Sequence, residues 1–458
     1  MAAYEYDVTV IGGGPGGYVA AIRAAKEGMR VCLVERGGLG GVCLNEGCIP
    51  TKTLIKTANL LHEIRHAEDF GIEGVNREAV RVSMPKLQRR KQSVVRRLVG
   101  GVKSLLRGNN VAVLEGEASF VDAHSIEVNG KRISSEYFIV ATGSSAAISG
   151  FIRQEGENRV LTSREALELE AVPASVAVIG GGVIGVEFAY LFNKLGSKVV
   201  VLELLERILP AVDEEVADLA RKRLEKDGVV FHTGAKVGMI KDNGVFFEKG
   251  GEFLSVAVEC VLLAAGRAPN TEGLRAGEIG LAFDRGALKT DESMRTNIAN
   301  IFAVGDVNGR MMLAHTASHE GIAAVETICG KPARVDYDKI PSCIYLEPEI
   351  ACVGLTEKQA RERGKNVRVG KFPMVANGKA LVEGETGGLG KIIVDGDSGE
   401  VLGAHLYAVR ATDLIAEIAV ALTLKATAEE IIHSVHPHPT VSEIVPEAFM
   451  AAYGKAIH

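Results

Sequence analysis

Two cysteines, Cys43 and Cys48, stand five positions apart in the segment Gly41-Val-Cys-Leu-Asn-Glu-Gly-Cys-Ile-Pro-Thr-Lys52. They could form a reducible disulfide, supply half of a metal site, or be two buried thiols. In an unbroken α-helix their Cα atoms would lie about 8–9 Å apart, whereas a disulfide needs about 4.4–6.8 Å. A disulfide therefore requires Gly47 and Pro50 to distort the turn, and a distorted, exposed disulfide is readily reduced. No second cysteine or histidine cluster lies nearby to complete a metal shell, so we expect no metal there.

A histidine near the end of the chain could carry protons for such a thiol pair. It belongs to His436-Pro-His-Pro-Thr-Val-Ser-Glu443, in which Glu443 follows His438 by five positions. Imidazole titrates near neutral pH, and a neighbouring carboxylate would fix its tautomer. Taken alone, a histidine near a glutamate is more often structural than catalytic. A redox-active cysteine pair elsewhere in the chain reverses that expectation.

The cysteine pair directly follows a dinucleotide-binding fingerprint. Tyr6-Asp-Val-Thr-Val-Ile-Gly-Gly-Gly-Pro-Gly-Gly17 reads as a buried strand, a glycine turn and a helix start, with Gly12, Gly14 and Gly17 as G-x-G-x-x-G. The first glycine allows a tight turn, the second lets the backbone approach a pyrophosphate, and the third lets the helix pack on the strand. Free N–H groups at the helix start then attract phosphate. A second apolar run ends in Glu35, the acid expected to bind a ribose hydroxyl.

The fingerprint recurs in the middle of the chain. Gly180, Gly182 and Gly185 repeat the glycine pattern, and Glu203 repeats the acid. Gly12 and Glu35 are 23 positions apart, as are Gly180 and Glu203. Both copies close later with an apolar strand and a glycine, at residues 138–144 and 261–267. We therefore predict two Rossmann-type domains. The carboxylate of Glu203 would repel a 2′-phosphate, and no basic residue follows it until Arg207, so NAD is favoured over NADP.

The overall composition predicts an ordinary globular protein of about three domains. The chain has 458 residues, 47% of them hydrophobic and 24% charged, with a net charge of −6. This charge gives no general attraction to nucleic acid or to anionic membranes. No apolar run could span a bilayer, and an apolar strand begins by Val8, leaving no room for a signal peptide. We expect a cytoplasmic protein, where a surviving disulfide is usually catalytic.

Three further segments complete the organisation of the chain. A basic amphipathic helix is predicted around residues 86–107, with a solvated basic face as the preferred reading and an acidic docking partner as the alternative. Residues 300–306 read as a strand that returns the chain toward the first domain. After a boundary marked by prolines near residues 332 and 341, the last segment mixes strands with a helix from about Thr412 to Leu424. It carries no glycine fingerprint, which suits an interface domain.

Taken together, these motifs resemble the flavin-dependent pyridine nucleotide–disulfide oxidoreductases over essentially the whole length. The segments that carry the resemblance are the Gly-Gly-x-Cys-Leu-Asn-x-Gly-Cys-Ile-Pro run, the strand ends Ala-Thr-Gly143 and Gly-Arg-Ala-Pro-Asn270, Gly-Asp306, Met312-Leu-Ala-His315 and His438-Pro-Thr-x-x-Glu443. The resemblance implies an α/β fold with two Rossmann-like domains and a C-terminal α+β dimerisation domain. It further implies an FAD-binding domain at residues 1–147, an NAD-binding domain at 148–272, a central segment completing the FAD side at 273–338, and an interface domain at 339–458.

The resemblance also assigns roles to individual residues. The residues that match catalytic positions are Cys43, Cys48, His438, Glu443, Lys52 and Glu187, the last two as an ion pair near the flavin. The residues that match FAD-contact positions are Gly12, Gly14, Gly17, Glu35, Lys52, Gly116, Thr142, Gly143, Asp306 and Ala314. The residues that match NAD-contact positions are Gly180, Gly182, Gly185, Glu187, Glu203, Val237 and Gly266. Three departures from the family pattern are Val42 in place of Thr, Thr51 in place of Ser and Pro437 in place of Ala; the first could retune the flavin potential.

The implied reaction is the oxidation of protein-bound dihydrolipoyl groups by NAD+. The implied partners are a second copy of the chain and the lipoyl domain of a 2-oxoacid dehydrogenase acyltransferase or a glycine-cleavage lipoyl protein, with no nucleic acid and no membrane. The competing reading is an NADPH-dependent reductase of glutathione or a similar small disulfide, against which Glu203 argues. A mercuric reductase is disfavoured because the chain ends without a cysteine pair. A non-catalytic flavin-binding subunit would have no need of the two cysteines, the histidine and the glutamate together.

Overall fold

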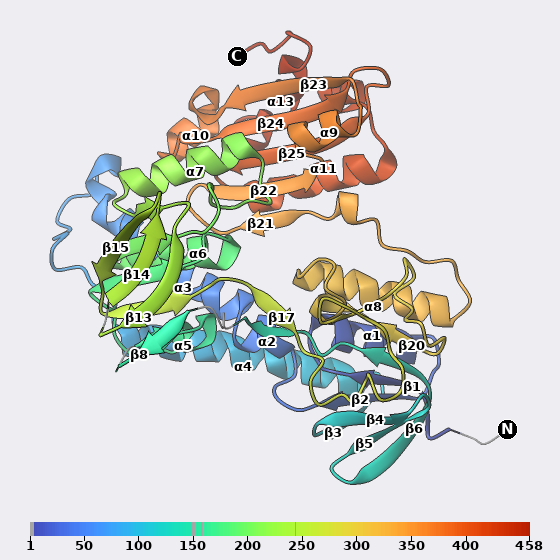
Figure 1. The fold of residues 1–458 in the computed structure, drawn as a ribbon. Helices are drawn as coiled ribbons and strands as arrows, with labels where there is room; N and C mark the ends of the chain where they lie inside the picture. The colour runs from blue at the N-terminus through green and yellow to red at the C-terminus, as the bar shows by residue number, and fades with distance from the viewer. Residues whose placement is uncertain (1–3, 148–151, 157–158, 243) are drawn as a thin grey trace.

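The computed structural model describes residues 4–147, 152–156, 159–242 and 244–458. The chain forms three lobes (Figure 1). Two lobes are built on parallel sheets, and the third, formed by the C-terminal part of the chain, carries an antiparallel sheet. The predicted α/β class, with two Rossmann-like domains followed by an α+β module, is confirmed.

The first lobe is a parallel sheet in the strand order β3-β2-β1-β6, extended by the antiparallel strands β5 and β4. Its inner strands are nearly uninterrupted apolar runs, as expected for strands that are covered on both faces. Strand β20 pairs in parallel with β6, which confirms that the chain returns to this sheet after the second lobe. The strands are β1 (Tyr6–Ile11), β2 (Val31–Glu35), β3 (Ala112–Glu115), β4 (Ala118–Asp122), β5 (Ser125–Val128), β6 (Lys131–Val140) and β20 (Ile301–Ala303).

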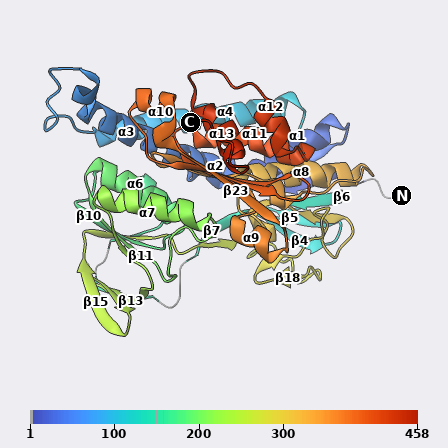
Figure 2. The ribbon, with the colours of Figure 1, turned by 90° about the horizontal axis from the view of Figure 1, so that it is seen from above.

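The helices of the first lobe pack mainly in two pairs. Helices α1 and α8 lie side by side against its sheet, and α3 and α4 pack together as a long pair (Figure 2). The predicted basic helix is confirmed as α4, which exposes its charged side chains except Lys91, which is buried and pairs with Glu168. The helices are α1 (Pro15–Lys26), α2 (Gly41–Asn45), α3 (Cys48–Arg65), α4 (Met84–Gly108) and α8 (Ala314–Ile328). No helix in the described ranges is long and apolar enough to cross a membrane.

The second lobe repeats the first in its central strands. Its parallel sheet has the order β12-β11-β10-β16-β9, and a separate sheet, β15-β14-β13-β8, packs beside it. Helices α5, α6 and α7 belong to this lobe. The elements are α5 (Ser163–Leu167), α6 (Val183–Leu195), α7 (Glu214–Lys226), β8 (Arg153–Glu155), β9 (Val160–Leu161), β10 (Ser175–Ile179), β11 (Lys198–Leu202), β12 (Val230–His232), β13 (Lys236–Lys241), β14 (Gly244–Lys249), β15 (Glu252–Ala257) and β16 (Cys260–Leu263).

Two short ribbons lie outside these sheets, one where the chain passes between the first two lobes and one within the central segment. Strand β17 pairs with β7, and β18 pairs with β19, all antiparallel. These strands are β7 (Ser144–Ala146), β17 (Arg267–Pro269), β18 (Phe283–Asp284) and β19 (Ala287–Leu288).

The third lobe is an antiparallel sheet in the order β21-β22-β25-β24-β23. Helices α11 and α13 pack against it, and α7 of the second lobe contacts β25. The predicted helix near residues 412–424 is confirmed as α11. The elements are β21 (Ser342–Ile344), β22 (Glu349–Gly354), β23 (Val367–Pro373), β24 (Leu389–Asp395), β25 (Val401–Ala408), α9 (Glu357–Glu362), α10 (Gly378–Glu383), α11 (Ala411–Leu424), α12 (Ala428–His433) and α13 (Ile444–Ala451).

Candidate active site and dinucleotide sites

The two cysteines lie on either side of a helix break. Cys43 is in α2, and Cys48 is the first residue of α3. The break falls at Gly47, where a Cβ would come within 3.0 Å of the Val42 carbonyl oxygen. Pro50 lies inside the first turn of α3, where its missing N–H costs no helical hydrogen bond. In a continuous helix Pro50 would have to donate a hydrogen bond to Glu46, which it cannot do, so the break agrees with the expectation that Gly47 and Pro50 both distort the turn.

The two thiols interact across the break, and their environments make them unequal. The hydrogen bond from Cys43, followed by the charge of Lys52, lowers the pKa of Cys48 to about 7 against the opposing effect of burial. The same bond and burial raise the pKa of Cys43. The position of Cys48 at a helix N-terminus also favours the thiolate. Cys48 is therefore the sulfur that is better suited to hold negative charge in the reduced state.

An ion pair next to the cysteines joins all three lobes. Lys52, one turn beyond Cys48, places its Nζ 2.8 and 3.0 Å from the carboxylate oxygens of Glu187 on α6. The backbone N–H of Tyr345 donates to the same carboxylate at 2.9 Å, and Lys52 Nζ lies 4.5 Å from the centre of the Tyr345 ring. Only 5% of the Glu187 side chain is exposed. The predicted Lys52–Glu187 pair is thus present, and Tyr345 is a member of the site that the sequence did not indicate, because it comes from the third lobe.

The first glycine fingerprint forms a tight cradle. Gly12 has a φ of +106°, and a Cβ there would lie 2.3 Å from the Ala141 carbonyl oxygen. A Cβ on Gly17 would lie 1.8 Å from the Gly12 carbonyl oxygen, so only glycine lets α1 approach the strand. Gly14 caps α1, and no side chain takes the N–H groups of the first turn. These groups remain free for a phosphate.

The acid of the first fingerprint stabilises the turn that it faces. Glu35 accepts hydrogen bonds from the N–H of Gly13 at 2.5 Å and from the N–H of Gly37 at 2.6 Å. A carboxylate oxygen has further acceptor capacity beyond one bond. Glu35 also lines the cavity, as expected for a residue that binds a ribose.

Residues from distant segments complete the first site. Asp306, after β20, hydrogen-bonds to Ser144 and lies 3.8 Å from Arg267. Arg267 in turn donates to the hydroxyl of Ser144 at 2.7 Å. The sequence did not single out Ser144, and it noted Arg267 only as part of a strand end. The remaining predicted residues also line the cavity, namely Gly116, Thr142, Gly143 and Ala314.

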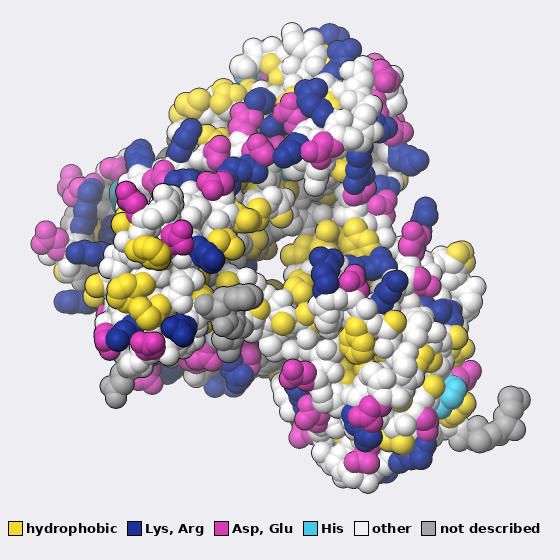
Figure 3. All heavy atoms as spheres, viewed as in Figure 1, with side chains coloured by type: hydrophobic (Ala, Val, Ile, Leu, Met, Phe, Trp, Pro, Cys, Tyr) yellow, Lys and Arg dark blue, Asp and Glu magenta, His cyan; other side chains and the backbone are white. Residues whose placement is uncertain are grey.

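A cavity of about 1530 Å³ connects these groups. Figure 3 shows the molecule hollowed between the lobes, with hydrophobic side chains gathered on the walls. Cys43, Cys48, Lys52 and Glu187 line this cavity together with the first fingerprint. Its size, its glycine-rich floor, the uncapped start of α1 and the carboxylate of Glu35 fit an elongated dinucleotide whose reactive end lies beside the cysteines.

The second fingerprint reproduces the first in detail. Gly180 has a φ of +112°, and its Cβ would lie 2.4 Å from the Ala264 carbonyl oxygen. A Cβ on Gly185 would lie 1.9 Å from the Gly180 carbonyl oxygen. Glu203 accepts hydrogen bonds from the N–H groups of Gly181 and Leu205. Gly182 caps α6 without a side-chain acceptor for the first-turn N–H groups.

The second site meets the cavity only at one end. Gly182, Glu187 and Gly266 line the cavity, whereas Gly180, Gly185, Glu203 and Val237 are not among its lining residues. Val237, on β13, is half-buried, and Ala235 just before it donates its N–H to the Glu203 carbonyl oxygen at 2.8 Å. The second site therefore extends away from the cavity, starting at the end that Gly182, Glu187 and Gly266 line.

The predicted histidine–carboxylate pair is present on the third lobe. His438 Nδ1 lies 2.8 Å from Glu443 Oε1, and 77% of the His438 side chain is exposed. The other oxygen of Glu443 accepts the N–H of Thr440 at 2.9 Å, which holds the carboxylate in place. The hydrogen bond from His438 and that N–H lower the pKa of Glu443 against the effect of burial, so the carboxylate stays charged. His438 does not line the cavity that holds the cysteines.

Comparisons with known proteins agree with this arrangement. The family model described as pyridine nucleotide-disulphide oxidoreductase matches residues 6–321, and its dimerisation domain matches residues 340–449. A dihydrolipoyl dehydrogenase of Bacillus subtilis is 42% identical and covers 100% of both chains. One of Geobacillus stearothermophilus is 42% identical, covering 100% of this chain and 98% of the relative.

Solved structures give the same picture. The HOCl-induced flavoprotein disulfide reductase RclA from Escherichia coli superposes with a TM-score of 0.86 at 30% identity, over 97% of this chain and 99% of that one. LpdA from Mycobacterium tuberculosis gives a TM-score of 0.88 at 28% identity, also over 97% and 99%. With two matching fingerprints, a cysteine pair beside the first and a dimerisation domain at the end, the chain belongs to the pyridine nucleotide-disulphide oxidoreductase family.

Proposed function

We propose that the protein is a dihydrolipoyl dehydrogenase, which oxidises dihydrolipoyl groups with NAD+ by means of FAD and the Cys43–Cys48 pair. The observation that carries the proposal is the position of this pair in the cavity that joins the two dinucleotide sites. The curated relatives at 40–43% identity over nearly the whole chain support the substrate. Bound FAD supplies a two-electron acceptor between the thiols and NAD+.

We assign the cofactors by domain. Residues 1–147 and the central segment 273–338 hold FAD, residues 148–272 hold NAD, and residues 339–458 pair the subunits. The two glycine cradles and the two carboxylates, Glu35 and Glu203, support this division. The enclosed first site suits a resident cofactor, and the outward-facing second site suits an exchanging one.

The thiol chemistry begins with proton removal. His438, oriented by Glu443, takes the proton of one substrate thiol, and the thiolate attacks the sulfur of Cys43 in the oxidised protein. The Cys43–Cys48 bond breaks, and its electron pair leaves on Cys48, the sulfur with the lowered pKa. The second substrate thiol, after losing its proton, attacks the substrate sulfur bound to Cys43. The product leaves as a cyclic disulfide, and the protein holds the two-electron-reduced pair.

The Lys52–Glu187 pair, which lies next to Cys48, would support this chemistry. The Lys52 ammonium stabilises negative charge on Cys48, and Glu187, held by Tyr345, fixes the direction of the lysine. A lipoyl-bearing domain of a 2-oxoacid dehydrogenase acyltransferase or of a glycine-cleavage lipoyl protein is the proposed donor of the substrate. We propose a cytoplasmic location, in which a persisting disulfide is usually a catalytic one.

Steady-state turnover tests the activity. The purified protein is assayed with dihydrolipoamide and NAD+, and in parallel with glutathione disulfide and NADPH. We expect rapid turnover with the first pair and background rates with the second. The opposite result would establish the competing assignment as a small-disulfide reductase.

A mixed dimer tests the partner of His438. We expect His438 to act on the cysteines of the second subunit, because it is exposed and lies outside the cavity of its own chain. Inactive Cys43→Ser and His438→Gln chains are dissociated and reassociated together. Random pairing should restore up to about a quarter of wild-type activity, since half the dimers are mixed and each has one intact site of two. Heterodimers verified by mass without activity would place both residues in one chain's site.

A further inference from the structure

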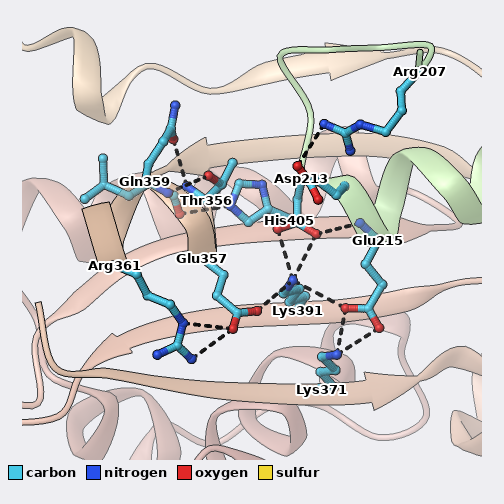
Figure 4. A network of polar contacts seen from close by, with 12 residues as sticks. Arg207, Asp213, Glu215, Thr356, Glu357, Gln359, Arg361, Lys371, Lys391 and His405 are labelled. Carbon is cyan, nitrogen blue, oxygen red and sulfur yellow. Dashed lines mark hydrogen bonds and ion pairs between the residues drawn. The ribbon is translucent and has the colours of Figure 1, made fainter. Parts of the chain in front are cut away.

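A buried lysine of the third lobe, Lys391 on β24, connects that lobe to the second. Its Nζ lies 3.1 and 3.0 Å from the two carboxylate oxygens of Asp213. It also lies 3.3 Å from Glu215 Oε2 and 3.1 Å from Glu357 Oε2 (Figure 4). The exposed fractions of the Lys391 and Asp213 side chains are 6% and 4%. The contact between these two groups is therefore shielded from water and salt.

The charges around this lysine are balanced. Glu215 is also bound by Lys371 at 2.7 Å, and Glu357 is also bound by Arg361 at 2.9 Å. Three cations thus face three carboxylates. Burial opposes the charge of Lys391, but its bonds to Asp213 and Glu357 outweigh this effect and raise its pKa. The lysine is consequently a permanent cation at neutral pH.

Asp213 connects the lysine to the nucleotide site. It caps α7 by accepting the N–H of Glu215, and it ends the segment 204–213 that begins next to Glu203. Ala211 and Val212, directly before Asp213, line the central cavity. The position of this wall is therefore fixed at one end by the second fingerprint and at the other by Lys391.

The third lobe forms the cavity wall that faces Ala211 and Val212. Thr356, Gln359 and His405 line the cavity there, and His405 is the register partner of Lys391 on the neighbouring strand β25. His405 Nε2 donates to the Leu355 carbonyl oxygen at 3.0 Å. Burial lowers the pKa of His405, so it is neutral. Strands β24 and β25 thus carry both His405, which lines the cavity, and Lys391, which holds the facing wall of the second lobe.

We propose that Lys391 is a positioning residue for the pyridine nucleotide, because it clamps segment 204–213 of the second lobe against the third lobe. Both walls line the cavity that Glu187 also lines, so the clamp would set the space in which the nicotinamide half of NAD+ would bind. The inference depends on the proposed function for the identity of the nucleotide. Lys391 does not contact the cysteines, so the clamp acts on nucleotide binding and leaves the thiol chemistry unaffected.

The test compares Lys391→Met with the flavin-loaded wild-type dimer. Titration calorimetry measures the Kd for NAD+, and stopped-flow absorbance measures flavin reduction by dihydrolipoamide without NAD+. We expect the Kd to rise about tenfold, the range in which coupling between packed elements operates, and flavin reduction to stay within about twofold of wild type. Hydrogen–deuterium exchange should increase in residues 204–217.

Three further variants control the result. Lys391→Arg keeps the charge and should restore most of the affinity. The pair Lys391→Met with Asp213→Asn removes the unpaired buried carboxylate while keeping a capping side chain, so it folds even if the single variant does not, and it should retain the weakened binding. Lys371→Met removes a neighbouring, half-exposed cation of the same cluster and should leave the Kd unchanged.

Each outcome decides the proposal. An unchanged Kd in the double variant, an equal rise in Lys371→Met, or an equal loss of flavin reduction by dihydrolipoamide would overturn the positioning role. Failure of dihydrolipoamide to reduce the wild-type protein would instead refute the proposed function, and the NAD+ titrations would still decide the role of Lys391.

Discussion

The two dinucleotide sites share their local geometry and differ in their surroundings. Gly12 and Gly180 both have a positive φ, and a Cβ added to either would lie at nearly the same distance from a backbone carbonyl oxygen. Glu35 and Glu203 accept hydrogen bonds from equivalent backbone N–H groups. The first site, however, is enclosed within the first lobe, where the segment after β20 and the start of α8 line the same cavity as the glycine turn. The second reaches that cavity only with its end near Glu187. The same fingerprint can therefore hold a resident cofactor or an exchanging one, depending on what packs over it.

Substituting the first glycine of each fingerprint should separate the two roles with the largest effect. Gly12→Ala forces a Cβ to within 2.3 Å of a backbone carbonyl oxygen in a conformation that alanine rarely adopts, so the protein should be purified almost without flavin. Gly180→Ala creates the same clash in the second lobe and should leave flavin bound while NAD+ turnover is lost. Flavin absorbance per chain measures the first effect, and NAD+ titration measures the second. Equal flavin loss in both variants would mean that the sites are not independent.

Nucleotide preference is the next largest expected effect. The carboxylate of Glu203 repels a 2′-phosphate, so catalytic efficiency with NAD+ should exceed that with NADP+ by at least about an order of magnitude. Glu203→Arg should narrow this gap without changing the flavin content. The matched change Glu35→Arg should reduce flavin content and leave the remaining molecules with wild-type preference. Equal rates of the wild-type protein with both nucleotides would contradict the role of Glu203.

The smallest expected effect concerns the ion pair between the two sites. The pKa of Cys48 is about 7, so in the two-electron-reduced protein the thiolate forms as the pH rises through this value. Lys52 lowers the pKa of Cys48 and Glu187 raises it. Lys52→Met should therefore move the thiolate midpoint to higher pH, and Glu187→Gln should move it to lower pH. The long-wavelength absorbance of the reduced protein, followed against pH, reports the midpoint, and Cys48→Ser serves as the control in which this absorbance is absent.

Local sequence patterns predicted much of this structure because dinucleotide sites depend on short-range geometry. The glycines, Glu35 and Glu203 each act within a single strand–turn–helix unit, and His438 and Glu443 are near neighbours in the chain. Lys52 and Glu187 could be paired only through the family resemblance, since 135 positions separate them.

Residues that contact the site from another lobe were not predicted, because their partners are distant in the sequence. Tyr345 acts through its backbone N–H, which has no sequence signature, and its ring meets Lys52 only after the third lobe has packed. Lys391 and Asp213 are 178 positions apart and look like ordinary charged residues in the sequence.

The pairing of β20 with β6 has a consequence for how the chain is made on the ribosome. The sheet of the first lobe contains residues 138–140 and 301–303, with the whole second lobe between them. Domains fold as units during synthesis, from the N-terminus onward. The second lobe should therefore be complete while the sheet of the first still lacks a strand, and flavin can be secured only after about two-thirds of the chain has emerged. Ribosome-bound chains stalled before residue 300 should bind NAD+ and fail to retain flavin.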